Sequence, residues 1–259
     1  MFPFPPILKL LHLILGLDTP HNFPPPLPAA EEQKAPVIIQ VYPRLINEEV
    51  GYYLAPVILA AAKKATVPVC FHLDHGPSEL EVMKALRWGA TGIMYDGSVH
   101  PYEENIANTK HIVETCASIG VEVEGELGHV GSVNDDAMEE YTDPKEAADF
   151  VKRTGVCCLA VLIGNAHGHY KKTPKLDIER VKAIREATGG LPLVLHGGSG
   201  IPDEEVKAAV KAGRESPPEY VEWIIGKLME LPDITFCPHG RPVAIEMTKN
   251  MLDHQFERL

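Results

Sequence analysis

Three histidines in this sequence share one local pattern, in which a histidine at the end of an expected strand is followed immediately by a glycine. They are His75 in HLDHG, His167 in NAHGH and His196 in LHGGSG. Neutral imidazoles that converge from separate strands are a common zinc-binding set, and they leave a fourth position open for a substrate. The glycine behind each ring lets the backbone turn sharply and approach a ligand. The pattern predicts that the three histidines bind one metal ion.

The HLDHG stretch holds a second histidine and an aspartate, and strand alternation separates their roles. Alternation places Cys70, His72 and Asp74 on one face of the strand. His72 lies inside the strand, where a packed and hydrogen-bonded imidazole is expected. His75 is expected to follow the end of the strand, where the chain is free to turn its ring toward a ligand. Asp74 would stand beside the metal and either carry a proton to or from a substrate or orient an imidazole.

Two carboxylates and a glycine-rich turn lie at comparable positions. Asp96 in YDGS and Glu126 in GELGHVGS have two interpretations. They are either a helix cap and a strand-end hydrogen-bonding group, or ligands of a second or alternative metal position. The turn HGGSG, residues 196–200, carries successive N–H groups that suit a phosphate at the start of a helix.

These polar residues fall at strand ends because the chain alternates short apolar runs with amphipathic stretches of helix length. The expected strands are PVIIQV (36–41), PVCFHLD (68–74), TGIMYD (91–96), VEVEGEL (121–127), CCLAVLIG (157–164) and LPLVLHGG (191–198). Such a series of βα units forms either a doubly wound sheet or a (β/α)8 barrel. Polar groups at the ends of five strands favour the barrel, because a doubly wound sheet draws on the strands at its switch point.

The two ends of the chain depart from this rhythm. The proline-dense stretch HNFPPPLPAA (21–30) predicts an extended linker. ILKLLHLIL (7–15) and ITFC (234–237) are the candidates for the two strands that an eight-stranded barrel still needs. We therefore expect a proline-rich segment over residues 1–30, a βα-repeat barrel core with the metal site over 31–213, and a segment over 214–259 that completes or caps the barrel.

The composition excludes several classes of partner. The chain has 259 residues, a formal net charge of −12, 45% hydrophobic residues and 23% charged residues. This is the composition of a globular protein, long enough for one large α/β barrel. The acidic balance argues against a nucleic-acid partner, which needs a basic face, and against an anionic membrane. The five cysteines contain no CxxC pair, so we expect neither a thiolate metal site nor disulfides, and a reducing, cytoplasmic compartment.

Taken together, HLDHG, YDGS, VEGELG, AHG and LHGGSG resemble, in order and approximate spacing, the motifs of the class II, zinc-dependent ketose-bisphosphate aldolases. This family contains the fructose- and tagatose-bisphosphate aldolases, and the resemblance runs from about residue 29 to residue 213. It implies a TIM (β/α)8 barrel and the reversible cleavage of a ketose 1,6-bisphosphate into dihydroxyacetone phosphate and glyceraldehyde 3-phosphate. It also implies a cytoplasmic homo-oligomer, a dimer or a tetramer, that acts in carbohydrate metabolism.

The resemblance also assigns roles to residues. The zinc ligands of the family fall on His75, His167 and His196. Its proton donor falls on Asp74, and Asp96 and Glu126 match carboxylates that bind a second or displaced cation, divalent or monovalent. Backbone contacts to dihydroxyacetone phosphate fall on Gly168, Gly197, Gly198 and Ser199.

Two features of the family pattern are missing from this sequence. The family opens with a strand that carries a short FN-type motif, and it ends with a KxN(V)xT-type strand that completes the phosphate site. We therefore expect the first and eighth strands to be atypical or missing. These altered ends keep open an alternative, a catalytically impaired metal-binding barrel with a regulatory or binding role. A further alternative is another metal-dependent barrel lyase or hydrolase that acts on an unphosphorylated substrate.

Overall fold

The computed structural model describes residues 13–17, 26–34, 36–130, 141–167, 170, 173–198 and 200–213. All of them belong to one compact unit, Met1–Glu215, and the second unit, Ser216–Leu259, lies outside the described residues. The candidate strand at 234–237 therefore lies outside them as well. The predicted domain boundaries at residues 30 and 213 stay predictions.

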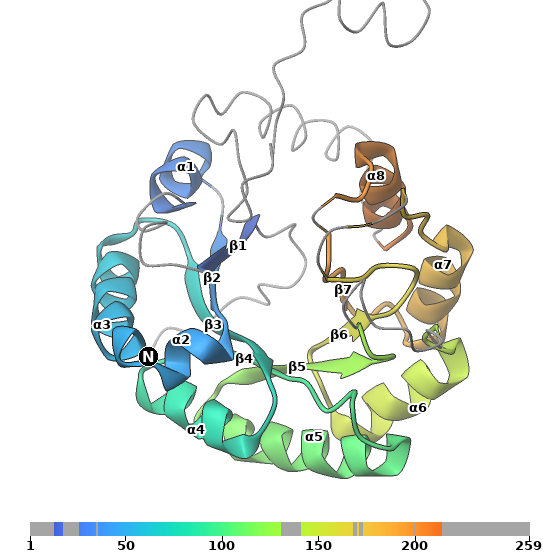
Figure 1. The fold of residues 1–259 in the computed structure, drawn as a ribbon, viewed down its shortest axis with the longest axis horizontal. Coiled ribbons are helices and arrows are strands. Elements are labelled where there is room, and N and C mark those ends of the chain that lie inside the picture. The colour runs from blue at the N-terminus through green and yellow to red at the C-terminus, as the bar shows by residue number, and fades with distance from the viewer. Residues whose placement is uncertain are drawn as a thin grey trace, which may run out of the picture. The chain divides into compact units, whose positions relative to one another are not determined.

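The unit is built on one parallel sheet of seven strands in which each strand pairs with the next one along the chain (Figure 1). The strands are β1 (Leu13–Leu17), β2 (Val37–Val41), β3 (Val69–Gly76), β4 (Gly92–Tyr95), β5 (Glu122–Leu127), β6 (Cys158–Val161) and β7 (Leu193–Val194). Parallel neighbours need a crossover between them, which is usually a helix. The sheet curls through this unit and forms a partial TIM barrel (Figure 1).

The helices lie on the outer side of the curled sheet (Figure 1). They are α1 (Pro26–Gln33), α2 (Pro43–Asn47), α3 (Glu49–Lys64), α4 (Glu79–Arg87), α5 (Tyr102–Ala117), α6 (Pro144–Thr154), α7 (Ile178–Ala187) and α8 (Asp203–Ala212). No helix among the described residues is long and apolar enough to cross a membrane.

Local sequence explains where these helices begin and end. The Asp143 side chain accepts hydrogen bonds from the N–H groups of Lys145 (2.8 Å) and Glu146 (3.1 Å), and so caps α6. Pro144 occupies the first turn, where its missing N–H costs nothing. Gly155 ends the same helix with a φ of +76°, which a glycine adopts without strain. These start and stop residues fix both ends of α6, and therefore the point at which the chain turns toward β6.

Two apolar clusters hold the helices against the sheet. One contains Ile39 and Leu73 from the strands with Ile58 from α3. The other contains Leu159 from β6 with Phe150 from α6, and both side chains are fully buried. Because β4 and β6 are buried along their whole length, their sequences are apolar without alternation, as is usual in parallel sheets covered by helices.

The six strands expected from the sequence are all present and in the expected order, although β6 and β7 are shorter than their apolar runs. β1 lies at residues 13–17, which overlap the candidate segment 7–15. The expectation of an extended linker over 21–30 is wrong for its last part, because α1 begins at Pro26. The two prolines of α1, Pro26 and Pro28, both fall in its first turn, where helices tolerate proline.

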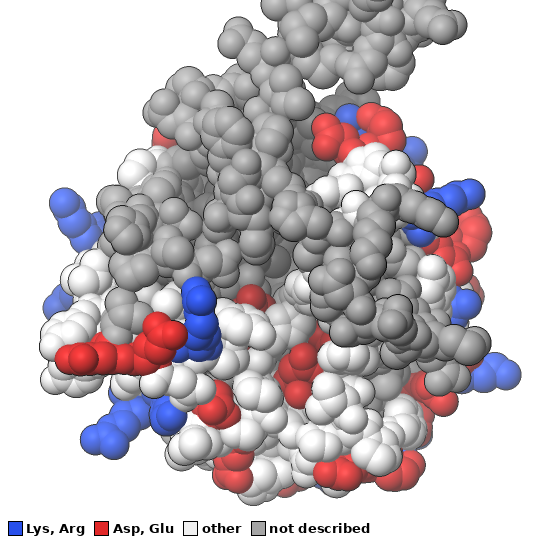
Figure 2. Space-filling model, viewed as in Figure 1, with Lys and Arg blue, Asp and Glu red and all other residues white. Residues whose placement is uncertain are grey.

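Charge is distributed unevenly over the described surface. On the face drawn in Figure 2, most of the visible lysine and arginine side chains lie over the outer helices, and acidic atoms also appear toward the centre. Acidic residues outnumber basic ones, 36 to 24, in the whole sequence.

Candidate metal centre

The three glycine-backed histidines lie together at the carboxyl edge of the sheet. His75 is near the end of β3, His167 follows β6 and His196 follows β7. The ring centroid of His75 is 4.4 Å from that of His196 and 4.9 Å from that of His167, and the other two centroids are 6.0 Å apart. One ring nitrogen of each histidine lies within 4.8 Å of the others. The parallel strands thus bring together three imidazoles that are far apart in the sequence.

The backbone of His75 turns its ring toward the other two. Its φ is +48°, in the left-handed region that residues other than glycine rarely adopt. The pairing of β3 with β4 shifts register between Leu73 and Gly76, as in a β-bulge, which can re-aim a side chain. The expectation that the strand ends before His75 is therefore wrong: β3 continues to Gly76, and a local irregularity turns the ring.

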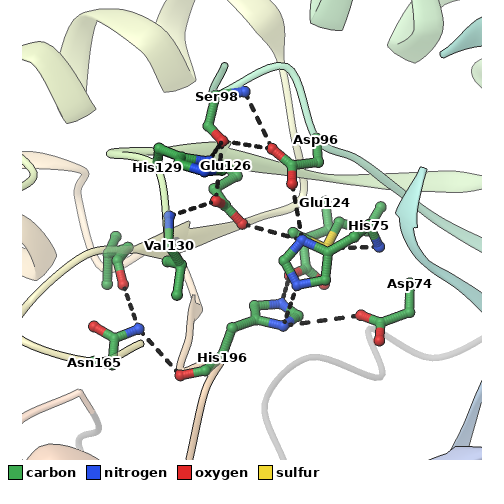
Figure 3. A network of polar contacts seen from close by, with 12 residues as sticks. Asp74, His75, Asp96, Ser98, Glu124, Glu126, His129, Val130, Asn165 and His196 are labelled. Atoms are coloured by element: carbon green, nitrogen blue, oxygen red, sulfur yellow. Dashed lines mark hydrogen bonds and ion pairs between the residues drawn. The ribbon is translucent and has the colours of Figure 1, made fainter. Parts of the chain in front are cut away.

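Asp96 and Glu126 flank the other side of the His75 ring (Figure 3). Nδ1 of His75 donates a hydrogen bond to Asp96 Oδ2 at 2.9 Å and lies 3.5 Å from Glu126 Oε2. Ser98 Oγ joins the two carboxylates, at 2.6 Å from Asp96 Oδ1 and 3.1 Å from Glu126 Oε1. His75, Asp96 and Glu126 form a second group with the spacing of metal ligands. A second cation position at this place is geometrically available.

The surroundings give the histidines different protonation states. Burial opposes a charge on His75, but the hydrogen bond to Asp96 and the neighbouring carboxylates outweigh it and raise its pKa to about 9. Burial and the charges of His75 and His196 lower the pKa of His167 to about 4. Burial also opposes the charge of Asp96, yet the hydrogen bonds that it accepts lower its pKa to about 2. His167 is therefore a neutral imidazole near pH 7, which is the form that binds metal.

The nitrogens that face one another fit a cation. His75 donates through Nδ1 to Asp96, and His196 donates through Nε2 to Glu124 at 2.9 Å. The nitrogens that remain, His75 Nε2 and His196 Nδ1, are 3.0 Å apart. In neutral rings both carry lone pairs, so that only a shared proton or a cation between them relieves their repulsion. Nε2 of His167 is buried and has no hydrogen-bond partner within the described ranges, and a metal ion would satisfy it.

Asp74 lies beside the histidines and belongs to neither ligand group. Its side chain is 19% exposed, and Oδ1 lies 3.8 Å from His196 Nδ1. That distance is too long for a hydrogen bond that would orient the imidazole. Oδ1 is buried and accepts no hydrogen bond from the part of the chain that the structure describes. A carboxylate with a free oxygen next to a metal-binding set favours the proton-carrying interpretation.

Glu124 is the main component of the site that the sequence analysis did not single out. It is buried on β5, where Oε1 accepts the hydrogen bond from His196 and Oε2 lies 3.5 Å from His72 Nε2. Its signal was present in VEVEGEL, because Glu122, Glu124 and Glu126 alternate along one strand, and a buried carboxylate needs a partner. His72 is buried, as expected for a packed imidazole, but its Nε2 makes no hydrogen bond within the described residues.

Asn105, Ser98 and His129 surround the two carboxylates Glu126 and Asp96. Asn105 Nδ2 donates to the backbone carbonyl of Glu126 at 3.0 Å. Ser98 Oγ, which bridges the two carboxylates, lies 3.0 Å from Nδ1 of the exposed His129. Ser98 belongs to the YDGS motif and could have been found there, whereas a helical Asn and a loop His carry no local signal.

The turn after His196 is held by close backbone contacts. Asn165 Nδ2 donates to the carbonyl of His196 at 3.1 Å, and the Tyr170 hydroxyl donates to the carbonyl of Gly197 at 3.0 Å. Gly197 has a φ of +64°, and a Cβ at this position would lie 2.4 Å from the carbonyl oxygen of Ala166. Both the conformation and the space require glycine here.

The four residues expected to bind phosphate are only partly described. Gly197 and Gly198 follow His196 at the carboxyl edge of the sheet, and a Cβ added at Gly198 would meet nothing within 4 Å. Gly168 and Ser199 lie outside the described residues. Their contacts with a substrate stay predictions.

A curled parallel sheet with histidines and carboxylates at its carboxyl edge defines a protein of the TIM-barrel class with a candidate metal centre. Comparison with known proteins identifies the family. Residues 26–215 match the family model described as fructose-bisphosphate aldolase class-II. The chain belongs to the class II fructose-bisphosphate aldolase family, a family of carbon–carbon lyases, and the resemblance drawn from its motifs is confirmed.

Individual relatives agree with this assignment. The fructose-bisphosphate aldolase of Geobacillus stearothermophilus is 44% identical over 193 residues, which cover 72% of this chain and 67% of that protein. The uncharacterized protein YdjI of Escherichia coli is 44% identical over 191 residues, which cover 71% of this chain and 68% of that protein. A crystal structure titled as the YdjI aldolase aligns with a TM-score of 0.64 and 37% identity, over 78% of this chain and 80% of that chain.

Proposed function

We propose that this chain is a zinc-dependent aldolase that reversibly cleaves a ketose 1,6-bisphosphate, fructose or tagatose, into dihydroxyacetone phosphate and glyceraldehyde 3-phosphate. The observation that carries the proposal is the convergence of His75, His167 and His196, with Asp74 beside them. Three imidazole ligands with an open position are a usual catalytic zinc set. Membership of the class II fructose-bisphosphate aldolase family supports the aldol reaction. The general metal dependence of this family supports a metal ion at the three histidines.

Each residue of the site has a separate role in this reaction. Zinc held by the three histidines would polarise the ketose carbonyl. When the bond between C3 and C4 breaks, the C4 hydroxyl gives its proton to Asp74, and the electron pair of the bond stays with C3. Addition of a proton to C3 then completes dihydroxyacetone phosphate, and in the synthetic direction Asp74 returns its proton to the C4 oxygen. The N–H groups of Gly197 and Gly198 bind a phosphate of the substrate. Asp96 and Glu126 hold His75 in place or bind a second cation.

The eighth strand and the assembly state belong to the same proposal. Seven strands are described, and an eighth between β7 and β1 would close the barrel. Residues 234–237, which the sequence analysis names as a candidate strand, lie outside the described residues. A homo-oligomer, dimer or tetramer, in the cytoplasm is proposed from the family resemblance and the cysteine pattern, and light scattering of the purified full-length chain tests the assembly.

The function is tested by a metal assay combined with a cleavage assay on fructose and tagatose 1,6-bisphosphate. We expect about one tightly bound zinc ion per chain, loss of cleavage on chelation, and recovery when zinc is restored. His167→Ala should lose zinc and activity, whereas His111→Ala, which changes an exposed histidine on α5, should change neither.

Other outcomes separate the alternatives. Absence of bound zinc, or cleavage unchanged by a chelator, would refute the zinc mechanism. Tight zinc without cleavage of either bisphosphate would select the catalytically impaired barrel. Turnover of unphosphorylated substrates alone would select another type of metal-dependent lyase or hydrolase.

A further inference from the structure

One buried carboxylate contacts two buried histidines, and only one of these histidines is a candidate metal ligand. We propose that Glu124 is a positioning residue of the metal centre: it holds His196 with Nε2 protonated, so that Nδ1 is the nitrogen that faces the metal. The inference rests on the proposed zinc function and assigns a role to a residue on β5 that is not itself a ligand.

The geometry of His196 supports this role. Its Nε2 donates to Glu124 Oε1 at 2.9 Å, and both side chains are more than nine-tenths buried. Its Nδ1 points the opposite way, to Nε2 of His75 at 3.0 Å. An imidazole that donates through one nitrogen presents a lone pair on the other, so the hydrogen bond selects the tautomer. Figure 3 shows the His196 ring close to His75 and Asp74.

The burial of Glu124 argues against a purely structural role. Burying a charge is costly unless it is paired, and an apolar side chain could fill the same space without this cost. Burial opposes the charge of Glu124, but the hydrogen bond from His196 and the ion pair with His72 outweigh it and lower the pKa of Glu124, so the side chain stays ionised. A carboxylate that accepts from a metal-binding imidazole also raises the basicity of the ring.

His72 restrains the other end of the same carboxylate. Its Nε2 lies 3.5 Å from Glu124 Oε2, within ion-pair distance, and makes no hydrogen bond among the described residues. The ring of His72 packs against β4 at Gly92, where an added Cβ would lie only 2.6 Å from Nδ1. His72 therefore lies close to β4, and its ion pair with Glu124 is a second contact of the carboxylate that accepts from His196. His72, the first histidine of HLDHG, thus lies next to the carboxylate that orients His196.

The test compares Glu124→Gln with Glu122→Gln in the full-length chain. Both variants remove one negative charge from β5, but the Glu122 side chain is exposed and does not contact His196. Zinc affinity is measured by competition with a chromophoric chelator, and the geometry of the site by the visible spectrum of the Co²⁺-substituted proteins. We expect zinc affinity to fall about 10- to 100-fold in Glu124→Gln with an altered Co²⁺ spectrum, and both to be unchanged in Glu122→Gln.

A merely structural role predicts a different result. In that case Glu124→Gln would lower the urea midpoint of the metal-free protein, while the folded variant would bind zinc as tightly as Glu122→Gln, and the proposal would be overturned. If Glu124→Gln does not fold, ¹⁵N NMR of the imidazoles in the zinc-loaded wild-type chain decides. Protonated Nε2 on His196 supports the proposal, and zinc coordination through Nε2 refutes it.

These outcomes are separate from those of the proposed function. If the proteins bind zinc but cleave no ketose bisphosphate, the proposed reaction is wrong, and the ratio of zinc affinities still decides the role of Glu124. If the wild-type chain binds no zinc, both proposals are wrong.

Discussion

The turn after His196 allows the sharpest test of how the fold positions the metal centre, through the substitution Gly197→Ala. The new Cβ would lie 2.4 Å from the Ala166 carbonyl oxygen, a distance at which the backbone itself has to move. The left-handed φ of +64° adds strain of about 1–2 kcal/mol for any residue with a Cβ. Overpacking against a rigid neighbour adds about 1–3 kcal/mol. We therefore expect a loss of about 2–5 kcal/mol in the free energy of unfolding.

Gly189→Ala is the matched control, because it separates conformational strain from the clash. Gly189 has a similar φ of +68°, but an added Cβ there would meet nothing within 4 Å. This variant should lose only the strain of about 1–2 kcal/mol. Gly198→Ala, with neither a positive φ nor a neighbour within 4 Å, should cost less still.

The same displacement should reach the metal, because Gly197 directly follows His196, whose carbonyl is held by Asn165 at 3.1 Å. We expect Gly197→Ala to weaken zinc binding about 10- to 100-fold, comparable with the loss of a group that orients a ligand. Urea unfolding of the chelated proteins gives the stability, and chelator competition gives the zinc affinity. Equal stability and equal zinc affinity in Gly197→Ala and Gly189→Ala would refute the idea that the Ala166 contact constrains the turn.

Three further predictions concern the proton carrier, the protonation of the site and the core. Asp74→Asn should lower the cleavage rate about 10²- to 10⁴-fold while the zinc content is retained, and loss of zinc instead would make Asp74 a structural residue. The folded-state pKa of His75, about 9, lies above the ordinary value of 6.5. Its contribution to the stability of the metal-free protein is therefore complete below pH 6.5 and lost as the pH rises through about 9. Urea unfolding with a chelator present should show this decline, and Asp96→Asn should reduce it; a stability that rises over this range would contradict it. Phe150→Ala removes a fully buried ring and should lower the free energy of unfolding, measured in urea, by about 3–5 kcal/mol. A smaller loss would mean that the apolar cluster around Phe150 and Leu159 collapses into the cavity.

Of the residues in the site, His75 could be predicted from the sequence and Glu124 could not. His75 was identified because a strand-end histidine followed by glycine is a local pattern, and two other histidines repeat it. Glu124 has a local pattern as well, the alternation of glutamates in VEVEGEL, but its importance depends on a histidine 72 residues away. The residues next to Glu124 and next to His196 in the sequence do not indicate that His196 donates to this glutamate.

The amino-acid sequence by itself determined the order of the strands, their parallel arrangement and the edge of the sheet at which Asp74, His75, Asp96, Glu126 and His196 gather. Strand length, helix punctuation and hydrophobic periodicity are local properties, and all parallel strands end at the same edge. Only the tertiary structure decided that α1 starts within the proline-rich stretch, that β3 passes through His75 with a positive φ, and which ring nitrogens face one another. These features depend on the curl of the sheet and on distances between strands, which neighbours in sequence do not encode.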